Sequence, residues 1–163
     1  DLRRSRGLGD VYKRQGEELY FKGIPSFSPE HFRFINNADP LKSKQLNKGI
    51  DQLMDEGVAQ LFTLKSNGRK IIGTVGALQY EVIQYRLEHE YGAKCSYENY
   101  SAHKALWIES KSEKQLEEFL KLKSRYTAED KLGRIVFFAD SPFGLQMSVE
   151  KFNKLIFHEK SEY

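Results

Sequence analysis

The sequence predicts an α+β fold, built mainly from an antiparallel sheet with helices on one face. Two observations support this prediction. Short runs rich in β-branched and aromatic residues alternate with longer runs that carry apolar side chains at helical spacing. In addition, the strand-type runs 58–64 and 71–77, and likewise 93–100 and 104–110, are separated by short polar turns, which is typical of hairpins. The 163-residue chain is long enough to bury a core without disulfides or metals.

The first elements are predicted from local end signals. Residues 19–24 form a strand-type run of apolar and aromatic residues. Ser28 followed by Pro29 then predicts the start of a short helix, because serine caps free amides and proline suits the first helical turn. Phe27 and Phe32 are placed to act as a hydrophobic staple across that start.

A second, longer helix is predicted from Asp39 and Pro40, which repeat the cap signal, to Gly57, which ends it. Its buried face is expected to consist of Leu46, Ile50, Leu53 and Met54. These positions recur every three to four residues, so they lie on one side of the helix.

The sequence Ser-Asn-Gly at 66–68 predicts the turn of the first hairpin, because Asn and Gly tolerate positive φ. The second strand of that hairpin, 71–77, leads directly into a third helix, which Gly92 ends. The side chains expected on its buried face are Val82, Ile83, Leu87 and Tyr91.

The second half of the chain continues with alternating strands and helices. Ser112 opens a capping-box pattern before a fourth helix, and Ser141 with Pro142 opens a fifth. The apolar residues that these two helices are expected to bury are Leu116, Phe119, Leu120, Leu145, Val149 and Phe152. Strands are predicted at 135–138 and 155–158.

The predicted element order defines the fold class. The first part has the order β-α-α-β-β-α-β and the second β-α-β-α-β, with no internal repeat in the sequence. We therefore predict a ferredoxin-like plait that is extended by a second β-α-β-α-β part. The pattern leaves open whether the second part continues the same sheet or forms a smaller lobe.

Residues 1–15 differ from the rest of the chain. They have no periodic pattern, and residues 10–15 resemble an in-frame translation of a transposon end used to prepare sequencing libraries. We interpret 1–15 as an artefactual or disordered tail and 16–163 as the domain. The tail holds five basic and two acidic side chains, which accounts for the net charge of +3 of the whole chain. Residues 16–163 are thus neutral overall, and the basic pI is no argument for nucleic-acid binding.

The sequence contains no recognisable catalytic, cofactor-binding or metal-binding site. A Gly-x-x-x-x-Gly-Lys-Ser/Thr loop is absent, and Gly73 and Gly76 are interpreted as close-packing positions within a strand. Cys95, the single cysteine, is interpreted as a buried apolar residue, and Trp107 as a core or lobe-interface residue. The histidines, which lack metal-ligand spacing, are His31, His89, His103 and His158. A lone thiol and the lack of a long apolar run predict a cytoplasmic protein that does not cross a membrane.

Basic clusters are the remaining candidates for function. One lies on the second helix, one lies beside the hairpin turn, and a third runs along and beyond the fourth helix; each could contact a phosphate backbone. The third consists of Lys111, Lys114, Lys121, Lys123 and Arg125. The first two supply the six candidate contact residues, Lys42, Lys44, Lys48, Lys65, Arg69 and Lys70. Acidic residues lie near each cluster in the sequence, so a merely solvated surface is the alternative interpretation.

The order of these elements and several local motifs resemble a known family. The segments 16–33 and 39–62, and above all Gly-Ala-Leu-Gln-Tyr at 76–80, resemble the C-terminal domain of bacterial peptide chain release factor 3. Elongation factor G and the ribosomal protection proteins typically carry Gly-Glu-Leu-His-Leu at the matching place. The resemblance covers nearly all of 16–163 and is less distinctive beyond Ser124.

The resemblance implies the third, C-terminal domain of a translation-termination GTPase that promotes dissociation of the codon-reading class I release factors. It implies contact with ribosomal RNA and ribosomal protein, and upstream GTPase and β-barrel domains. GTP and Mg²⁺ are then ligands of the upstream part, and no enzyme activity or cofactor is expected in this chain. We consider two alternatives: the third domain of an elongation-factor-G-like or ribosomal-protection GTPase, and a free-standing α+β enzyme that uses an acid and a histidine in a cleft.

Overall fold

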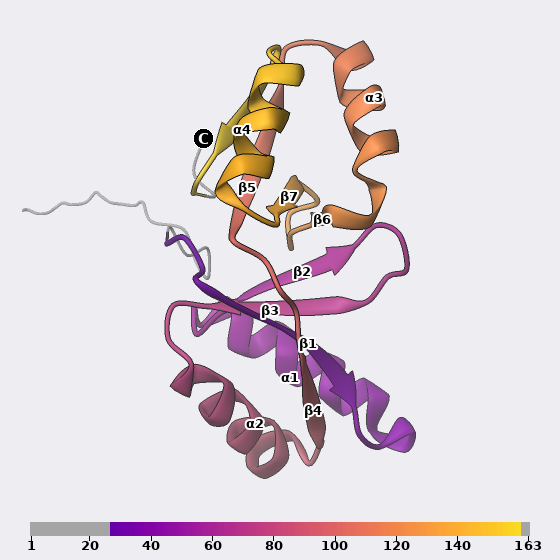
Figure 1. The fold of residues 1–163 in the computed structure, drawn as a ribbon. Helices are drawn as coiled ribbons and strands as arrows, with labels where there is room; N and C mark the ends of the chain where they lie inside the picture. The colour runs from indigo at the N-terminus through magenta and orange to yellow at the C-terminus, as the bar shows by residue number, and fades with distance from the viewer. Residues whose placement is uncertain (1–26, 161–163) are drawn as a thin grey trace, which may run out of the picture.

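The computed structural model describes residues 27–160, which form one eight-stranded antiparallel sheet with four α-helices (Figure 1). The strands are β1 (His31–Asn37), β2 (Gln60–Leu64), β3 (Lys70–Thr74), β4 (Cys95–Asn99), β5 (Lys104–Ser110), β6 (Thr127–Glu129), β7 (Ile135–Ala139) and β8 (Leu155–His158). The helices are α1 (Ser43–Asp55), α2 (Leu78–Tyr91), α3 (Glu113–Leu122) and α4 (Pro142–Lys151), with short 3-10 turns η2 (Pro40–Lys42) and η3 (Ser124–Tyr126). The predicted α+β class with a mainly antiparallel sheet is therefore confirmed.

The sheet order shows that the chain folds as two copies of one motif. The order is β4-β1-β3-β2-β6-β7-β5-β8. Residues 31–99, the N-terminal plait, follow the path β-α-β-β-α-β, and residues 104–158, the C-terminal plait, repeat it. Each has the strand arrangement of a ferredoxin-like plait. The extension predicted as β-α-β-α-β is thus a second complete plait, and the repeat is structural although no repeat is visible in the sequence.

A short strand pair joins the two plaits into one sheet. Leu64 at the end of β2 lies opposite Ala128 in β6, and the backbone amide of Lys65 donates to the carbonyl of Thr127 at 3.0 Å. The second part therefore continues the same sheet. Strand β6 was missed in the sequence because its three residues are too few to show a periodic pattern.

Aromatic packing shows that the sheet bends back on itself. The rings of Phe32 in β1 and Phe138 in β7 lie 5.3 Å apart, although three strands separate them in the sheet order. Four strand spacings of a flat sheet would place them about 19 Å apart. The helix-free faces of the two plaits thus meet in one central cluster, while Figure 1 shows the helices at opposite ends of the molecule. This central cluster consists of Phe32, Phe62, Leu64, Ile71, Ala105, Trp107, Ala128, Val136 and Phe138.

The predicted position of Trp107, in the core or at the interface between the lobes, is confirmed. Its side chain is fully buried in the central cluster, and its ring centroid lies 5.9 Å from that of Phe62. Its indole Nε1 donates to Asp130 Oδ2 at 3.0 Å. The buried donor is therefore satisfied by the carboxylate that also organises the β6–β7 turn.

The predicted helix at Ser28 and Pro29 is wrong, and with it the staple between Phe27 and Phe32. This part of the chain leads into strand β1, which pairs with β3 and β4. Strand pairing prevails over the cap signal because Phe32 enters the central cluster and Pro29 packs on Gly73, where an added Cβ would lie 2.9 Å from Pro29 Cβ. The predicted strand 19–24 lies outside the described residues.

The second predicted hairpin is also wrong, because β4 and β5 do not pair with each other. β4 pairs with β1 at one edge of the sheet, whereas β5 lies between β7 and β8 in the other plait. The four residues between them cross from one plait to the other: the Tyr100 amide donates to the Phe32 carbonyl and the His103 amide to the Ala139 carbonyl. A short polar turn between two strand-type runs does not specify that the runs are neighbours.

Most predicted helix faces are confirmed, with two corrections. The predicted face of α1 is buried, as are Ile83 and Leu87 of α2 and Phe119 of α3. Val82 and Val149, in contrast, are exposed. The helical phase of α2 is set by Tyr80, which is fully buried and displaces Val82 to the outer side.

Candidate functional site

Titratable side chains do not gather into a metal centre within residues 27–160. No group of three or more His, Cys, Asp or Glu side chains there is arranged to hold a metal ion. His158 Nε2 lies 2.8 Å from Glu109 Oε1 across the edge strand β8 and its neighbour β5, and both side chains are partly exposed. Cys95 is buried as predicted, and burial raises the pKa of its thiol, which favours the unreactive protonated form.

The glycines near the end of β3 do not form a phosphate loop. Gly73 lies in the strand and closely approaches Pro29 and Phe62, which confirms that it is a close-packing position. It packs against Pro29, where the chain enters the domain, and not against a helix as predicted. Gly76 lies beyond the strand, which ends at Thr74, so its predicted place inside the strand is wrong. An added Cβ there would meet only the flexible Gln79 amide, 2.9 Å away.

Three of the six candidate cations form an exposed basic tip at the start of α1. Lys42 ends η2, and Lys44 and Lys48 lie one turn apart on the outer face of α1. Within the described part of the chain, no carboxylate forms an ion pair with any of the three. We call this group, Lys42, Lys44 and Lys48, the lysine tip.

A network of short polar contacts holds the lysine tip in place. The Asp39 side chain accepts from the Leu41 amide at 3.1 Å, and the Asn37 side chain accepts from the Asp39 amide at 2.9 Å. Ser43 Oγ donates to the Pro40 carbonyl at 3.0 Å. These bonds satisfy backbone groups at the predicted cap, which is confirmed. They also present Leu41, 89% exposed, beside the lysines, a feature that sequence reasoning missed because a single leucine carries no pattern.

Arg69 is anchored rather than free. Its guanidinium donates to Glu98 Oε1 at 2.7 Å and to Asn36 Oδ1 at 3.1 Å, and it lies 3.7 Å over the Phe34 ring. The hydrogen bond from Arg69, followed by that from Asn36, lowers the pKa of the Glu98 carboxyl. Stacking and ion pairing together orient Arg69 across β3, β1 and β4.

The two remaining candidate cations also have partners. Lys65 forms an ion pair with Glu129 at 3.0 Å, next to the β2–β6 junction. Lys70 Nζ donates to Asn47 Oδ1 of α1 at 3.2 Å, which links the start of β3 to the helix that carries the lysine tip. The hairpin turn at 66–68 is confirmed, with Gly68 at φ +75°. Lys65, Arg69 and Lys70 flank this turn, but the structure does not gather their side chains, because each contacts a different element.

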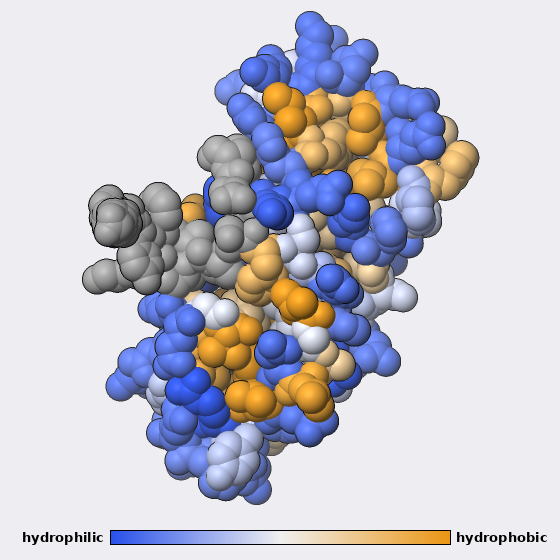
Figure 2. Space-filling view, turned by 90° about the vertical axis from the view of Figure 1, so that its left-hand side faces the viewer, coloured by the Kyte–Doolittle hydropathy of each residue, from blue (hydrophilic) through white to orange (hydrophobic). Residues whose placement is uncertain are grey.

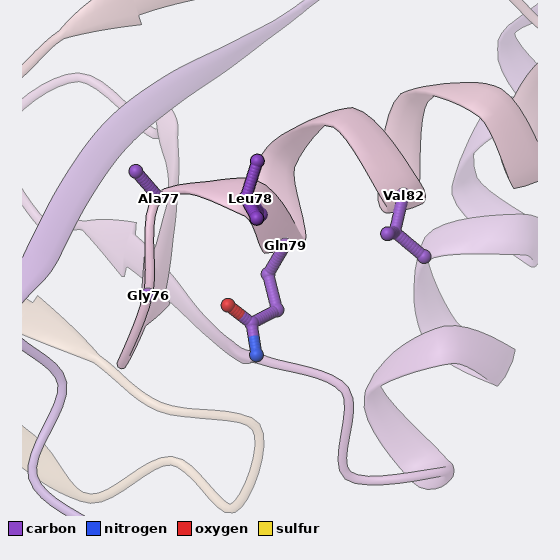
Figure 3. A pocket seen from close by; sticks show the side chains of 5 residues that line it. All are labelled: Gly76, Ala77, Leu78, Gln79 and Val82. Carbon is purple, nitrogen blue, oxygen red and sulfur yellow. The ribbon is translucent and has the colours of Figure 1, made fainter.

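A shallow apolar hollow lies at the start of α2, and Figure 3 shows its lining residues. They are Gly76, Ala77, Leu78, Gln79 and Val82. The hollow is held in place by Tyr80, whose hydroxyl donates to the Ile72 carbonyl of β3 at 2.6 Å. Burial raises the pKa of Tyr80 to about 12, so the phenol remains a donor at neutral pH. None of the lining side chains is ionisable, so the hollow offers contact surface rather than acid-base chemistry.

No helix in the described part of the chain is long and apolar enough to span a membrane.

The chain is an α+β domain made of two joined ferredoxin-like plaits. Its candidate contact sites, the lysine tip and the apolar hollow, both lie on its surface. Residues 21–149 match the family model described as the C-terminal domain of class II release factor RF3. The match covers most of the chain, and the chain belongs to this family. It is therefore a domain of a translation-termination factor of the release factor 3 type, as the resemblance implied.

Proposed function

We propose that this domain contacts the ribosome through the lysine tip and thereby serves a factor that promotes dissociation of class I release factors. Membership in the release factor 3 family supports the translational setting. The observation that carries the proposal is the contrast between the cations: Lys65 and Arg69 are ion-paired, whereas Lys42, Lys44 and Lys48 are exposed and have no carboxylate partner among residues 27–160.

The chemistry of the lysine tip fits ribosomal RNA. Three ammonium groups on a rigid helix start can neutralise backbone phosphates without reading bases. Leu41 stands beside them and adds an apolar contact for ribosomal protein or an exposed base. Arg69, Lys65 and Lys70 then serve as secondary contacts, because they must exchange or share their present partners.

Sedimentation with bacterial 70S ribosomes tests this proposal. The variant Lys42→Gln/Lys44→Gln/Lys48→Gln is compared with Lys111→Gln/Lys114→Gln/Lys121→Gln, which removes the same charge near α3. We expect the lysine-tip variant to bind more weakly and to reduce the slope of log affinity against log salt by about 2 to 3. Equal affinity and equal salt slope of the two variants would contradict the proposal.

We also infer that this chain neither binds nor hydrolyses GTP, and that the nucleotide and Mg²⁺ belong to a GTPase domain elsewhere in the factor. The sequence contains no loop of the Gly-x-x-x-x-Gly-Lys-Ser/Thr type. Calorimetric titration with GTP and Mg²⁺ should give no saturable isotherm, and a saturable one would overturn the inference. Such a factor acts on ribosomes in the cytoplasm.

A further inference from the structure

Helix α2 is apolar on two opposite faces. Tyr80, Ile83 and Leu87 are fully buried against the sheet and α1. On the other side Leu78, Val82 and Tyr85 are 72%, 48% and 63% exposed. The spacing of four and three residues places these three side chains above one another. A surface helix normally has a polar outer face, so this outer row requires an explanation.

The exposed row continues beyond the helix. Val75, in the loop before α2, is 45% exposed, and two residues of the exposed row, Leu78 and Val82, line the apolar hollow. Figure 2 shows apolar side chains on the lower half of this face, the half that contains α2, and a separate group on the upper half. We call Val75, Leu78, Val82 and Tyr85 the α2 stripe.

The charges around the α2 stripe argue against a nucleic-acid partner. The stripe itself carries no charge, and Glu81 and Glu88 lie on one flank of the helix. The single arginine of α2, Arg86, is held by Glu56 at 2.7 Å and Glu90 at 2.8 Å. Phosphates would be repelled by this helix, so its chemistry fits an apolar protein surface.

The chain enters the domain beside this stripe. The amide of Glu30 donates to the Thr74 carbonyl at 2.8 Å, and Thr74 directly precedes Val75. Pro29 packs on Gly73, the residue before that. Whatever polypeptide precedes this domain is therefore tethered within a few residues of the α2 stripe, which gives it a high effective concentration there.

We propose that the α2 stripe is the docking surface for the upstream part of the same polypeptide. The family is defined as the C-terminal domain of its factor, which places the rest of the factor on the N-terminal side of this domain. The proposal goes beyond ribosome contact: the α2 stripe holds the domain to its own protein, while the lysine tip faces outward. Docking would bury the exposed leucine, valine and tyrosine and account for the second apolar face of α2.

Thiol labelling tests the proposal. Leu78→Cys introduces an exposed thiol, whereas the natural Cys95 is buried. The variant is made in the 163-residue chain and in the full-length factor that contains this domain, with upstream cysteines replaced by serine. We expect maleimide to label position 78 about tenfold more slowly in the full-length factor, because a docked state favoured by ten to one protects the thiol to that extent. Lys121→Cys on α3 is the control and should label at equal rates in both proteins.

A second variant separates docking from other causes of protection. Adding Val82→Asp to Leu78→Cys in the full-length factor should restore the labelling rate of the short chain, because an exposed aspartate is tolerated but a docked one is not. Equal labelling of position 78 in the two proteins would overturn the proposal. Slower labelling of position 78 in the 163-residue chain at higher concentrations of that chain would overturn the proposal too, because a second copy would then occupy the α2 stripe.

Discussion

The N-terminal and C-terminal plaits share one topology but differ in how their helices pack. In the N-terminal plait α1 and α2 lie against each other, and Leu53 and Leu87 are completely buried. In the C-terminal plait α3 and α4 stand apart (Figure 1), and Leu116, Leu120 and Leu145 remain partly exposed. The same strand order therefore supports a closed helix layer in one half and an open one in the other.

One glycine accounts for much of this difference. Gly49 on α1 faces α2 so closely that an added Cβ would lie 2.7 Å from Leu87 Cδ2 and 2.9 Å from the Tyr91 ring. Its missing side chain lets the two helices approach each other. The C-terminal plait instead fills its helix layer with aromatic rings, and Phe119 has edge contacts with Phe137 and Phe152, both at 5.1 Å. Gly49 thus allows close helix contact in one layer, whereas aromatic rings fill the other.

The largest expected effect tests whether the two plaits are one cooperative unit. Phe62→Ala removes a fully buried ring that touches both plaits, and we expect a loss of about 3–5 kcal/mol in the free energy of unfolding. Urea unfolding is followed by the fluorescence of Trp107 and by far-UV circular dichroism. The two probes should give coincident transitions, because the central cluster spans the junction. Separate transitions would show that the plaits unfold independently.

The next test compares the two helix layers through the same substitution. Leu87→Ala in the closed layer should cost about 2–5 kcal/mol, since Leu87 has no exposure and its loss leaves a cavity. Leu116→Ala in the open layer should cost less than half as much, because the side chain is already partly in solvent. Urea midpoints at constant m-value provide the measurement, and equal losses would contradict the contrast between the layers.

Gly49→Ala addresses the close approach of α1 and α2. The added methyl group must displace the Tyr91 ring, and we expect a loss of about 1–3 kcal/mol despite the better helix propensity of alanine. Gly76→Ala is the matched control, because only the flexible Gln79 amide lies near it. A stabilised Gly49→Ala variant in thermal unfolding would show that the helix layer can expand freely.

Substitutions at the helix caps should change the free energy of unfolding of the two plaits by a smaller amount. Ser112 caps α3 by accepting from the Gln115 amide at 3.3 Å, whereas α2 begins at Ala77 without a side-chain cap. Ser112→Ala should therefore cost about 1 kcal/mol, and Ala77→Ser should be neutral or stabilising. Both values come from urea unfolding, and a neutral Ser112→Ala would mean that the open layer does not depend on its cap.

The smallest expected effect concerns exposed ion pairs of the N-terminal plait. Hydrogen bonds from Arg86 lower the pKa values of the Glu56 and Glu90 carboxyls. A carboxyl with a lowered folded-state pKa stabilises the fold above its unfolded value of about 4.3, and this contribution is lost as the pH falls through the folded-state pKa.

Stability should therefore fall between pH 5 and pH 3, and Arg86→Gln should make that fall smaller. Lys121→Gln on α3, which also removes one positive charge, is the control and should leave the fall unchanged. Urea midpoints at the two pH values test this, and an identical fall in Arg86→Gln would show that these exposed pairs contribute nothing measurable.

The candidate site was predicted in part. The six cations were identified from the sequence, and the hairpin turn and the cap at Asp39 were placed correctly because both depend on neighbouring residues. The pairing of Arg69 with Glu98 was not predicted, since 29 residues separate them and the β1–β3 and β1–β4 pairings together bring them into contact. The α2 stripe was not predicted, because the sequence analysis assigned Val82 to the buried face of the helix. The spacing of Leu78, Val82 and Tyr85 could have indicated a common exposed face.

The sequence by itself determined the elements whose signals are local: the caps of η2, α3 and α4, the glycine ends of α1 and α2, and the strong strands β5 and β7. Only the tertiary structure decided that residues 31–37 are a strand, that β4 and β5 pair with strands of different plaits, and that the two plaits share one central cluster. The physical reason is that a cap or turn depends on residues within a few positions. Strand partners and sheet curvature depend instead on contacts such as that between Phe32 and Phe138, which are distant in the chain.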